Sequence, residues 1–348
     1  MRINQLLLSG ATACAIFFGG TVSADEVTIA SWGGSYQEAQ SKALFKPVEK
    51  ALGIIIKEES YKGIGQVRTK VAAGSVPWDI IDTGSGGGAR GCAEEILIPL
   101  DYSMIDTSNF VADTQLSCCV GTIVFATVMA WNTDTYGDNG PQSWADFWDA
   151  EKFPGTRAIR GKMHGMLEPA LMADGVPADE VYSVLDSEEG INRALDKIRE
   201  LKPHVAVWWS SGAQHAQLMK DGEVDLSTGW NGRFDVAIAD GGNLKYTYSQ
   251  GLQDYDCFGI PKGAPNPDLA MSVIAEMSKA EYQADIPQYI TYGPTNTLAY
   301  ETGKIDETLA ASLPSHPDNA SQLLPISQEW YAKWEKMASE MYTDMMTE

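Results

Sequence analysis

Apolar runs and helix-spaced stretches alternate along the first part of the chain. The runs are rich in β-branched residues, which is typical of buried strands, and the stretches between them place apolar residues at helical intervals. Strand, helix and strand in this order predict right-handed crossovers and a mostly parallel sheet. Since ligands bind beyond the carboxyl ends of such strands, loops 31–36 and 83–88 should share one edge. The predicted strands are 27–30, 53–56 and 78–82, and the predicted helices are 35–50 and 67–73.

The pattern starts again after a long apolar run at 121–131. This run is rich in β-branched residues and too short to cross a bilayer, so it predicts a buried strand. A capping box begins at Ser143, and acidic residues open a helix over 187–201. Two α/β units without a flexible linker predict two domains with a cleft between them. Further predicted elements are strands at 224–228, 246–248 and 256–260, a helix at 267–277, and a last helix with Trp330, Trp334, Met337 and Met341 in the core.

The N-terminus has the pattern of a secretory signal peptide. Arg2 supplies a positive start, an apolar stretch follows, and small residues precede a cleavage site after Ala24. A membrane anchor is disfavoured because the apolar stretch is short and broken. Cys14 raises the alternative of a lipid-modified cysteine, but Ala11 stands where leucine is usual. We therefore expect export and removal of residues 1–24.

Composition and net charge limit the classes of molecule that the protein is expected to bind. The chain has 348 residues, with 47 acidic and 25 basic side chains and a formal net charge of −22. Sequence-independent binding of nucleic acid is disfavoured, because neutralising phosphates needs clustered Lys and Arg. The acidic balance fits a protein that stays dispersed or one that meets cationic solutes.

Four cysteines remain after export: Cys92, Cys118, Cys119 and Cys257. An oxidising compartment makes disulfides the expected state, and the absence of CxxC pairs argues against zinc. Adjacent Cys118 and Cys119 are not expected to bond each other, because vicinal geometry is strained. We predict Cys92–Cys118, which closes a modest loop within one domain, with Cys119–Cys257 as a weaker second pair. Free buried thiols remain the alternative.

A glycine-rich segment at 86–91 fits the GxGxxG pattern of dinucleotide sites. It follows the third predicted strand rather than the first, in an exported protein, so we favour a flexible rim whose N–H groups, with Ser85, face a ligand. The HExxH, GxSxG and GxxxxGK[ST] motifs are absent, and the four histidines lack metal-ligand spacing. The sequence therefore predicts no enzyme, no metal site and no cofactor, with a secreted enzyme kept as an alternative.

Aromatic side chains beside turns are the clearest ligand-site candidates. Turns 31–36 and 229–233 each follow a predicted strand and combine aromatic residues with glycines and polar groups. Packing alone explains any one of them, but together they predict the walls of a cleft that grips a small cationic or zwitterionic molecule. The candidates in these and two later turns are Trp32, Ser35, Tyr36, Trp230, Arg233, Tyr255, Asp256 and Tyr292.

Six short motifs in chain order carry a family resemblance. They resemble the periplasmic solute-binding proteins of ABC importers, in the branch that includes spermidine/putrescine-binding proteins. The matching stretches span nearly the whole mature chain. Each motif is weak alone, whereas their order and spacing together are specific. The motifs are the Trp32 turn and segments 78–81, 143–148, 229–232, 259–263 and 292–296.

The resemblance implies the type II periplasmic binding protein fold. In this fold two α/β lobes, each a mostly parallel sheet flanked by helices, enclose a ligand cleft at the hinge. Implied crossovers near Trp131, Asp256 and Tyr300 give the lobe boundaries, and the implied role is ligand capture by a monomer that closes and delivers to an inner-membrane permease. The boundaries are signal peptide 1–24, lobe 1 at 25–131 plus 256–300, and lobe 2 at 132–255 plus 301–348.

One departure from the family pattern bears on the ligand. Polyamine-binding members carry two carboxylates in the loop that follows the motif at 143–148, whereas the matching stretch 159–165 here has Lys162 and Gly165. A polycation would meet like charge there. His164 and Lys162 are ligand candidates, with simple solvation as the alternative.

Two charged residues remain at positions that suit a ligand with a carboxylate and an amine. Arg233 offers a planar fork for a carboxylate, and Asp256 matches the position where the family holds an amine. The sequence thus resembles binders of ω-amino acids such as 4-aminobutyrate more than polyamine binders. A polyamine carrier, a receptor-coupled sensor, and a structural salt bridge between Arg233 and Asp256 remain as alternatives.

Overall fold

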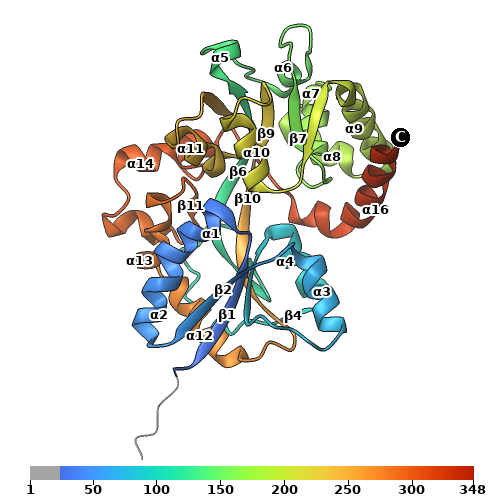
Figure 1. The fold of residues 1–348 in the computed structure, drawn as a ribbon. Coiled ribbons are helices and arrows are strands. Elements are labelled where there is room, and N and C mark those ends of the chain that lie inside the picture. The colour runs from blue at the N-terminus through green and yellow to red at the C-terminus, as the bar shows by residue number, and fades with distance from the viewer. Residues whose placement is uncertain (1–23) are drawn as a thin grey trace, which may run out of the picture.

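The computed structural model describes residues 24–348, so the signal peptide prediction for 1–24 falls outside the described residues except at Ala24. Two α/β lobes lie one above the other, and two long strands run between them (Figure 1). This is the predicted two-lobed architecture. None of the helices within 24–348 is long and apolar enough to cross a membrane.

One continuous sheet runs through both lobes. Its strand order is β2-β1-β3-β10-β6-β9-β7-β8. Strands β1–β3 are parallel in the lower lobe of Figure 1, and β7–β9 are parallel in the upper lobe. The long antiparallel pair β6 and β10 connects the two parallel groups (Figure 1). The strands are β1 (Glu26–Ser31), β2 (Ile55–Ser60), β3 (Ile80–Gly84), β4 (Leu97–Ile98), β5 (Gln115–Leu116), β6 (Cys119–Asn132), β7 (Arg157–Arg160), β8 (Val205–Trp209), β9 (Leu226–Trp230), β10 (Leu244–Pro261), β11 (Gly293–Pro294) and β12 (Leu324–Pro325).

Helices flank both parts of this sheet, and the first two are joined by a π-helical turn at Ser41–Phe45. They are α1 (Gly34–Gln40), α2 (Lys46–Leu52), α3 (Ile64–Ala72), α4 (Ser85–Ala93), α5 (Thr133–Tyr136), α6 (Trp144–Trp148), α7 (Leu167–Ala173), α8 (Val181–Leu185), α9 (Glu188–Leu201), α10 (Gly212–Lys220), α11 (Asn231–Ala239), α12 (Pro267–Met277), α13 (Ala280–Gln283), α14 (Glu307–Ser312), α15 (Pro317–Ala320) and α16 (Gln328–Thr347).

Most predicted elements are present, with displaced boundaries. The strand predicted at 53–56 starts later, because α2 runs to Leu52 and Gly53 ends it in the left-handed conformation. The strands predicted at 246–248 and 256–260 are parts of the single strand β10. In the last helix, Trp330 is buried but Met337 is exposed, so the predicted apolar stripe is wrong at Met337.

The glycine-rich segment is a helix, not the flexible rim that the sequence predicted. Gly88 lies in α4, where a Cβ atom would approach the Sγ of Cys257 to 2.7 Å and that of Cys119 to 3.1 Å. The glycines therefore let this helix pack directly on a disulfide, which is a structural reason for the GxGxxG pattern.

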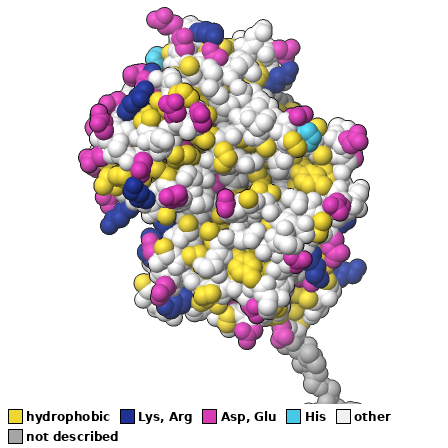
Figure 2. All heavy atoms as spheres, turned by 180° about the vertical axis from the view of Figure 1, so that it is seen from behind, with side chains coloured by type: hydrophobic (Ala, Val, Ile, Leu, Met, Phe, Trp, Pro, Cys, Tyr) yellow, Lys and Arg dark blue, Asp and Glu magenta, His cyan; other side chains and the backbone are white. Residues whose placement is uncertain are grey.

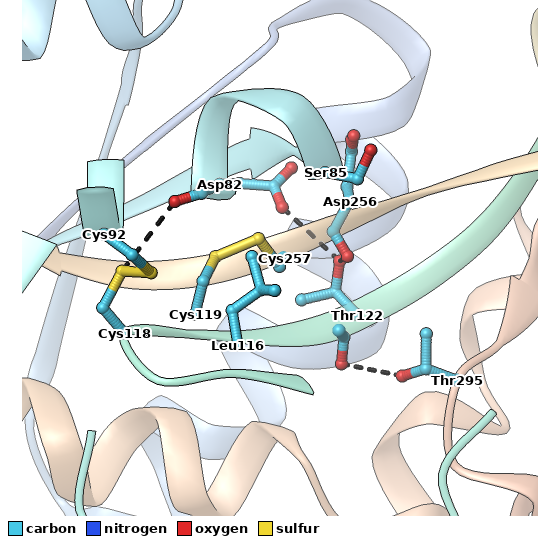
Figure 3. Close-up of a disulfide and its surroundings, with 12 residues drawn as sticks. Asp82, Ser85, Cys92, Leu116, Cys118, Cys119, Thr122, Asp256, Cys257 and Thr295 are labelled. Atoms are coloured by element: carbon cyan, nitrogen blue, oxygen red, sulfur yellow. Dashed lines mark hydrogen bonds between the residues drawn. A yellow bond between two sulfur atoms is a disulfide. The ribbon is translucent and has the colours of Figure 1, made fainter. Parts of the chain in front are cut away.

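Both predicted disulfides are present, and adjacent Cys118 and Cys119 do not bond each other (Figure 3). Cys92–Cys118 ties the end of α4 to the residue before β6. Cys119–Cys257 joins the two crossover strands β6 and β10. Both disulfides therefore lie where the crossover strands β6 and β10 meet α4.

Separate hydrophobic cores support the two lobes. One cluster draws on residues between 129 and 252 and on α16, and two others draw on residues between 27 and 123 and between 255 and 292. A fourth cluster draws on residues between 126 and 244 and on Leu323. A small fifth group, Ala284, Ala299, Ile305 and Leu313, lies across the boundary drawn at residue 300. The lobe boundaries given above stay a proposal.

Candidate functional site

A cleft of about 740 Å³ lies between the lobes and receives side chains from both. Eight of the predicted site residues line it. Most of them follow the end of a strand or lie at the start of the next helix, where the rule for parallel sheets places ligand contacts, whereas Asp256 lies within β10 and Tyr292 directly precedes β11. These residues are Trp32, Tyr36, Lys162, His164, Trp230, Arg233, Asp256 and Tyr292.

Three predicted residues lie outside this lining. Tyr255 packs in the core, because successive side chains of a strand point to opposite faces and its neighbours Asp254 and Asp256 face the cleft. Ser85 is fully buried, where its hydroxyl donates to the Asp254 carboxylate and accepts from Gln328 at 2.6 Å. Ser35 contributes at the rim by accepting a hydrogen bond from Arg233.

Two buried carboxyl groups form an acidic floor: Asp256 lines the cleft, and Asp82 lies behind it on the neighbouring strand (Figure 3). Asp82, in the middle of β3, accepts a hydrogen bond from Gln40 at 3.1 Å, and burial raises its pKa to about 7. Burial, followed by the negative charges of Asp82 and Asp254, also raises the pKa of Asp256, while the Trp32 side chain and the Arg233 charge oppose that rise. An ammonium group at this floor would relieve the repulsion.

Arg233 lies in the first turn of α11 and is 4% exposed. Its Nη1 donates to Ser35 Oγ and its Nη2 to the Gly33 carbonyl, each at 3.1 Å, so it links the upper lobe to the lower one. Its Nε has no partner among the described residues. The Arg233–Asp256 salt bridge that the sequence left open is not among the ion pairs found within 24–348.

Arg160 also faces the cleft, and the sequence reasoning missed it. It is the last residue of β7, its Nη1 donates to the His164 carbonyl at 2.9 Å, and its guanidinium lies 5.3 Å from the ring centroid of Trp230. The available signal was its place at the carboxyl end of a strand, directly before the segment that supplied Lys162 and His164.

A second group of charged side chains occupies the wall near α16. Arg90 pairs with Glu335 at 3.2 Å, and His164 Nε2 lies 2.9 Å from Asp254. Lys162 lies on the same wall, where burial, then the charges of Arg160 and Arg90, lower its pKa. Glu335 of this wall is thus paired with an arginine and Asp254 contacts a histidine, whereas Lys162 and Arg160 form no ion pair within residues 24–348.

Charged side chains do not cluster on the face of the molecule shown in Figure 2. Acidic and basic side chains are scattered over the face shown in Figure 2, without a gathering of Lys and Arg. Within residues 24–348, no three His, Cys, Asp or Glu side chains come together in a group that could hold a metal ion.

Comparison with known proteins places this architecture in a family. The family described as bacterial extracellular solute-binding protein matches residues 43–312. The gamma-aminobutyric acid-binding protein of Pseudomonas aeruginosa is 36% identical over 309 residues, which cover 88% of this chain and 86% of that protein.

Solved structures agree with this family assignment. The binding protein MotA from A. tumefaciens B6, in complex with glucopine, is 43% identical with a TM-score of 0.90, covering 92% of this chain and 99% of that one. A spermidine/putrescine ABC transporter substrate-binding protein from Streptococcus pneumoniae has a TM-score of 0.73 over 93% and 98% of the two chains. At 18% identity, that likeness shows the fold alone. The chain therefore belongs to the bacterial extracellular solute-binding protein family, as the solute-binding component of an ABC transporter.

Proposed function

We propose that this protein binds a small zwitterion, an ω-amino acid such as 4-aminobutyrate, in the periplasm and delivers it to an inner-membrane permease without catalysis. One observation carries the proposal: a buried carboxyl group, Asp256, and two guanidinium groups, Arg160 and Arg233, line one cleft and form no ion pair with one another. A ligand with one amine and one carboxylate supplies both missing charges.

The energetic reason is the cost of burying charge. An unpaired ion in a protein interior costs several kcal/mol, and most of that is recovered only when an opposite charge arrives with good hydrogen bonds. Closure around a zwitterion is therefore favourable, while closure around water leaves Asp256 and the guanidinium groups uncompensated. Trp32 and Trp230 line the same space and offer apolar faces to the methylene groups between the ligand's charges.

A polyamine fits this charge pattern less well. The wall where a distal amine would lie carries Lys162 and Arg160, and its acids already pair with Arg90 and His164. Like charges brought together in a closed cleft cost several kcal/mol. The relative with 36% identity is a gamma-aminobutyric acid-binding protein, which also supports an ω-amino acid as the ligand.

A larger amino-acid derivative is a second candidate, favoured by the size of the cleft. Ligand sites of about 300–1,000 Å³ hold drug-sized molecules, so a short ω-amino acid would leave much of the 740 Å³ to water. The relative with 43% identity was solved with glucopine, which supports this candidate.

Intrinsic tryptophan fluorescence tests the proposal, because Trp32 and Trp230 line the cleft. We expect saturable changes with 4-aminobutyrate or glucopine and none with putrescine or spermidine. Submicromolar binding of a polyamine, with no response to either amino compound, would contradict the proposal. Native mass spectrometry of freshly purified protein gives an independent mass for any retained ligand.

The export pathway is proposed from the signal peptide pattern. Cleavage after Ala24 leaves a mature chain that starts at Asp25. Intact-mass measurement of protein released from the periplasm checks the cleavage site, and gel filtration of the same sample checks the expected monomer.

A further inference from the structure

The two guanidinium groups of the cleft are in different states. Both terminal nitrogens of Arg233 already donate to the opposite lobe, to Ser35 Oγ and to the Gly33 carbonyl. Arg160 makes a single hydrogen bond to the protein within the described residues, from Nη1 to the His164 carbonyl. Nη2 of Arg160 therefore makes no hydrogen bond to the protein among the described residues, whereas each terminal nitrogen of Arg233 already makes one and its Nε does not.

The surroundings of Arg160 hold its charge in place without neutralising it. Its guanidinium lies over the rings of Trp230 and Trp209, with 5.3 Å and 5.8 Å to their centroids. No carboxylate lies within ion-pairing distance of it among residues 24–348. A planar fork stacked on aromatic faces keeps its donors in one plane, and this arrangement suits a carboxylate bound through two hydrogen bonds.

The surroundings of Arg233 fit a different task. Its helix belongs to the upper lobe, whereas its partners Gly33, before α1, and Ser35, in the first turn of α1, belong to the lower lobe. A Cβ atom on Gly34 would lie 2.9 Å from Arg233 Nη1, so glycine at this position permits the close approach. These hydrogen bonds exist only when the lobes are together.

We propose that Arg160 binds the ligand's carboxylate, and that Arg233 latches the two lobes in the closed state. The inference rests on the proposed function, because it concerns the same zwitterion and the same cleft. In this arrangement the ammonium group lies at Asp256 and the carboxylate lies beside Trp230. The loop at Gly33–Ser35 then closes over the ligand without contacting its charge.

The test compares an acid with its amide. Wild-type protein should bind 4-aminobutyrate more tightly than 4-aminobutyramide, by about 10- to 100-fold, since a charged hydrogen-bond acceptor is lost in the amide. In Arg160→Gln this preference should fall close to one, with affinity for the amide retained. In Arg233→Gln the acid and the amide should weaken alike, with the preference kept.

Two further variants serve as controls. Arg193→Gln removes an exposed arginine of the upper lobe, paired with Asp174, and should leave both affinities unchanged. Ser35→Ala removes one partner of the latch and should weaken both ligands by less than Arg233→Gln does. Binding of the amide shows that each variant is folded.

The outcomes distinguish failure of the roles given to Arg160 and Arg233 from failure of the proposed function. If Arg160→Gln keeps the preference for the acid, or if Arg233→Gln loses it instead, this inference is overturned while the proposed function stands. If the wild-type protein binds no 4-aminobutyrate, the proposed function for this ligand and the inference fall together.

Discussion

Asp256 and Asp82 lie on neighbouring strands at the floor of the cleft, where burial and then the negative charge of Asp82 raise the pKa of Asp256. Burial raises the pKa of Asp82 to about 7 as well. No cation of the protein forms an ion pair with either carboxyl group among the described residues. In the proposed function, a ligand ammonium group supplies this missing positive charge.

The first prediction concerns pH. Between its ordinary pKa near 3.8 and its folded pKa of about 7, Asp82 binds more protons in the folded protein than in the unfolded one. Stability of the ligand-free protein should therefore fall as pH rises through this window. Melting temperature measured from pH 4 to pH 8 should show the decline, and Asp82→Asn should flatten it. The same slope in wild type and Asp82→Asn would contradict the assignment.

The second prediction concerns Lys162, whose charge we propose disfavours polyamines. Lys162→Glu places an acid on the cleft wall and should strengthen putrescine binding by at least about tenfold, since like-charge repulsion costs several kcal/mol. Lys50→Glu is the matched control, because Lys50 is exposed on α2 and the net charge changes equally. Calorimetric titration with putrescine compares the two. Equal responses would show that Lys162 does not determine the exclusion.

The third prediction concerns the disulfides. Replacing both Cys92 and Cys118 by serine should lower the free energy of unfolding by about 2–4 kcal/mol, because the bond constrains the unfolded chain. Urea denaturation measures the loss. Peptide mapping without reduction should recover Cys92–Cys118 and Cys119–Cys257, and a different pairing would contradict the structure.

The fourth prediction concerns the helix that packs on a disulfide. Gly88→Ala should destabilise the protein by about 1–3 kcal/mol, because its new methyl group meets the sulfur of Cys257 at 2.7 Å. Gly65→Ala lies in α3 with nothing within 4 Å, and should be neutral or stabilising by up to about 1 kcal/mol. Thermal unfolding of the two variants provides the measurement. Equal stability of both would remove the packing explanation.

Periodicity was sufficient to predict the architecture but not some local features. The run at 121–131 predicted β6 because it is largely apolar and rich in β-branched residues, and the shared composition of their turns placed Trp32 and Trp230 at one cleft. The glycines at 86–88 were misinterpreted as a rim, because their reason lies in Cys257, which is distant in sequence.

Site residues were harder to predict where tertiary contacts decide their role. Tyr255 looked like a ligand contact beside Asp256, yet strand alternation turns it into the core. Arg233 was expected to offer a free fork, but whether its nitrogens are free depends on Ser35 in the other lobe. Arg160 carried no motif of its own, and its role depends on how it lies over Trp230.

A crystal structure of the protein with its bound zwitterion tests the central claim most directly. The account predicts the ligand's ammonium within hydrogen-bonding distance of the Asp256 carboxylate and its carboxylate on the guanidinium of Arg160. A reversed ligand, or one whose charges contact neither group, would contradict it.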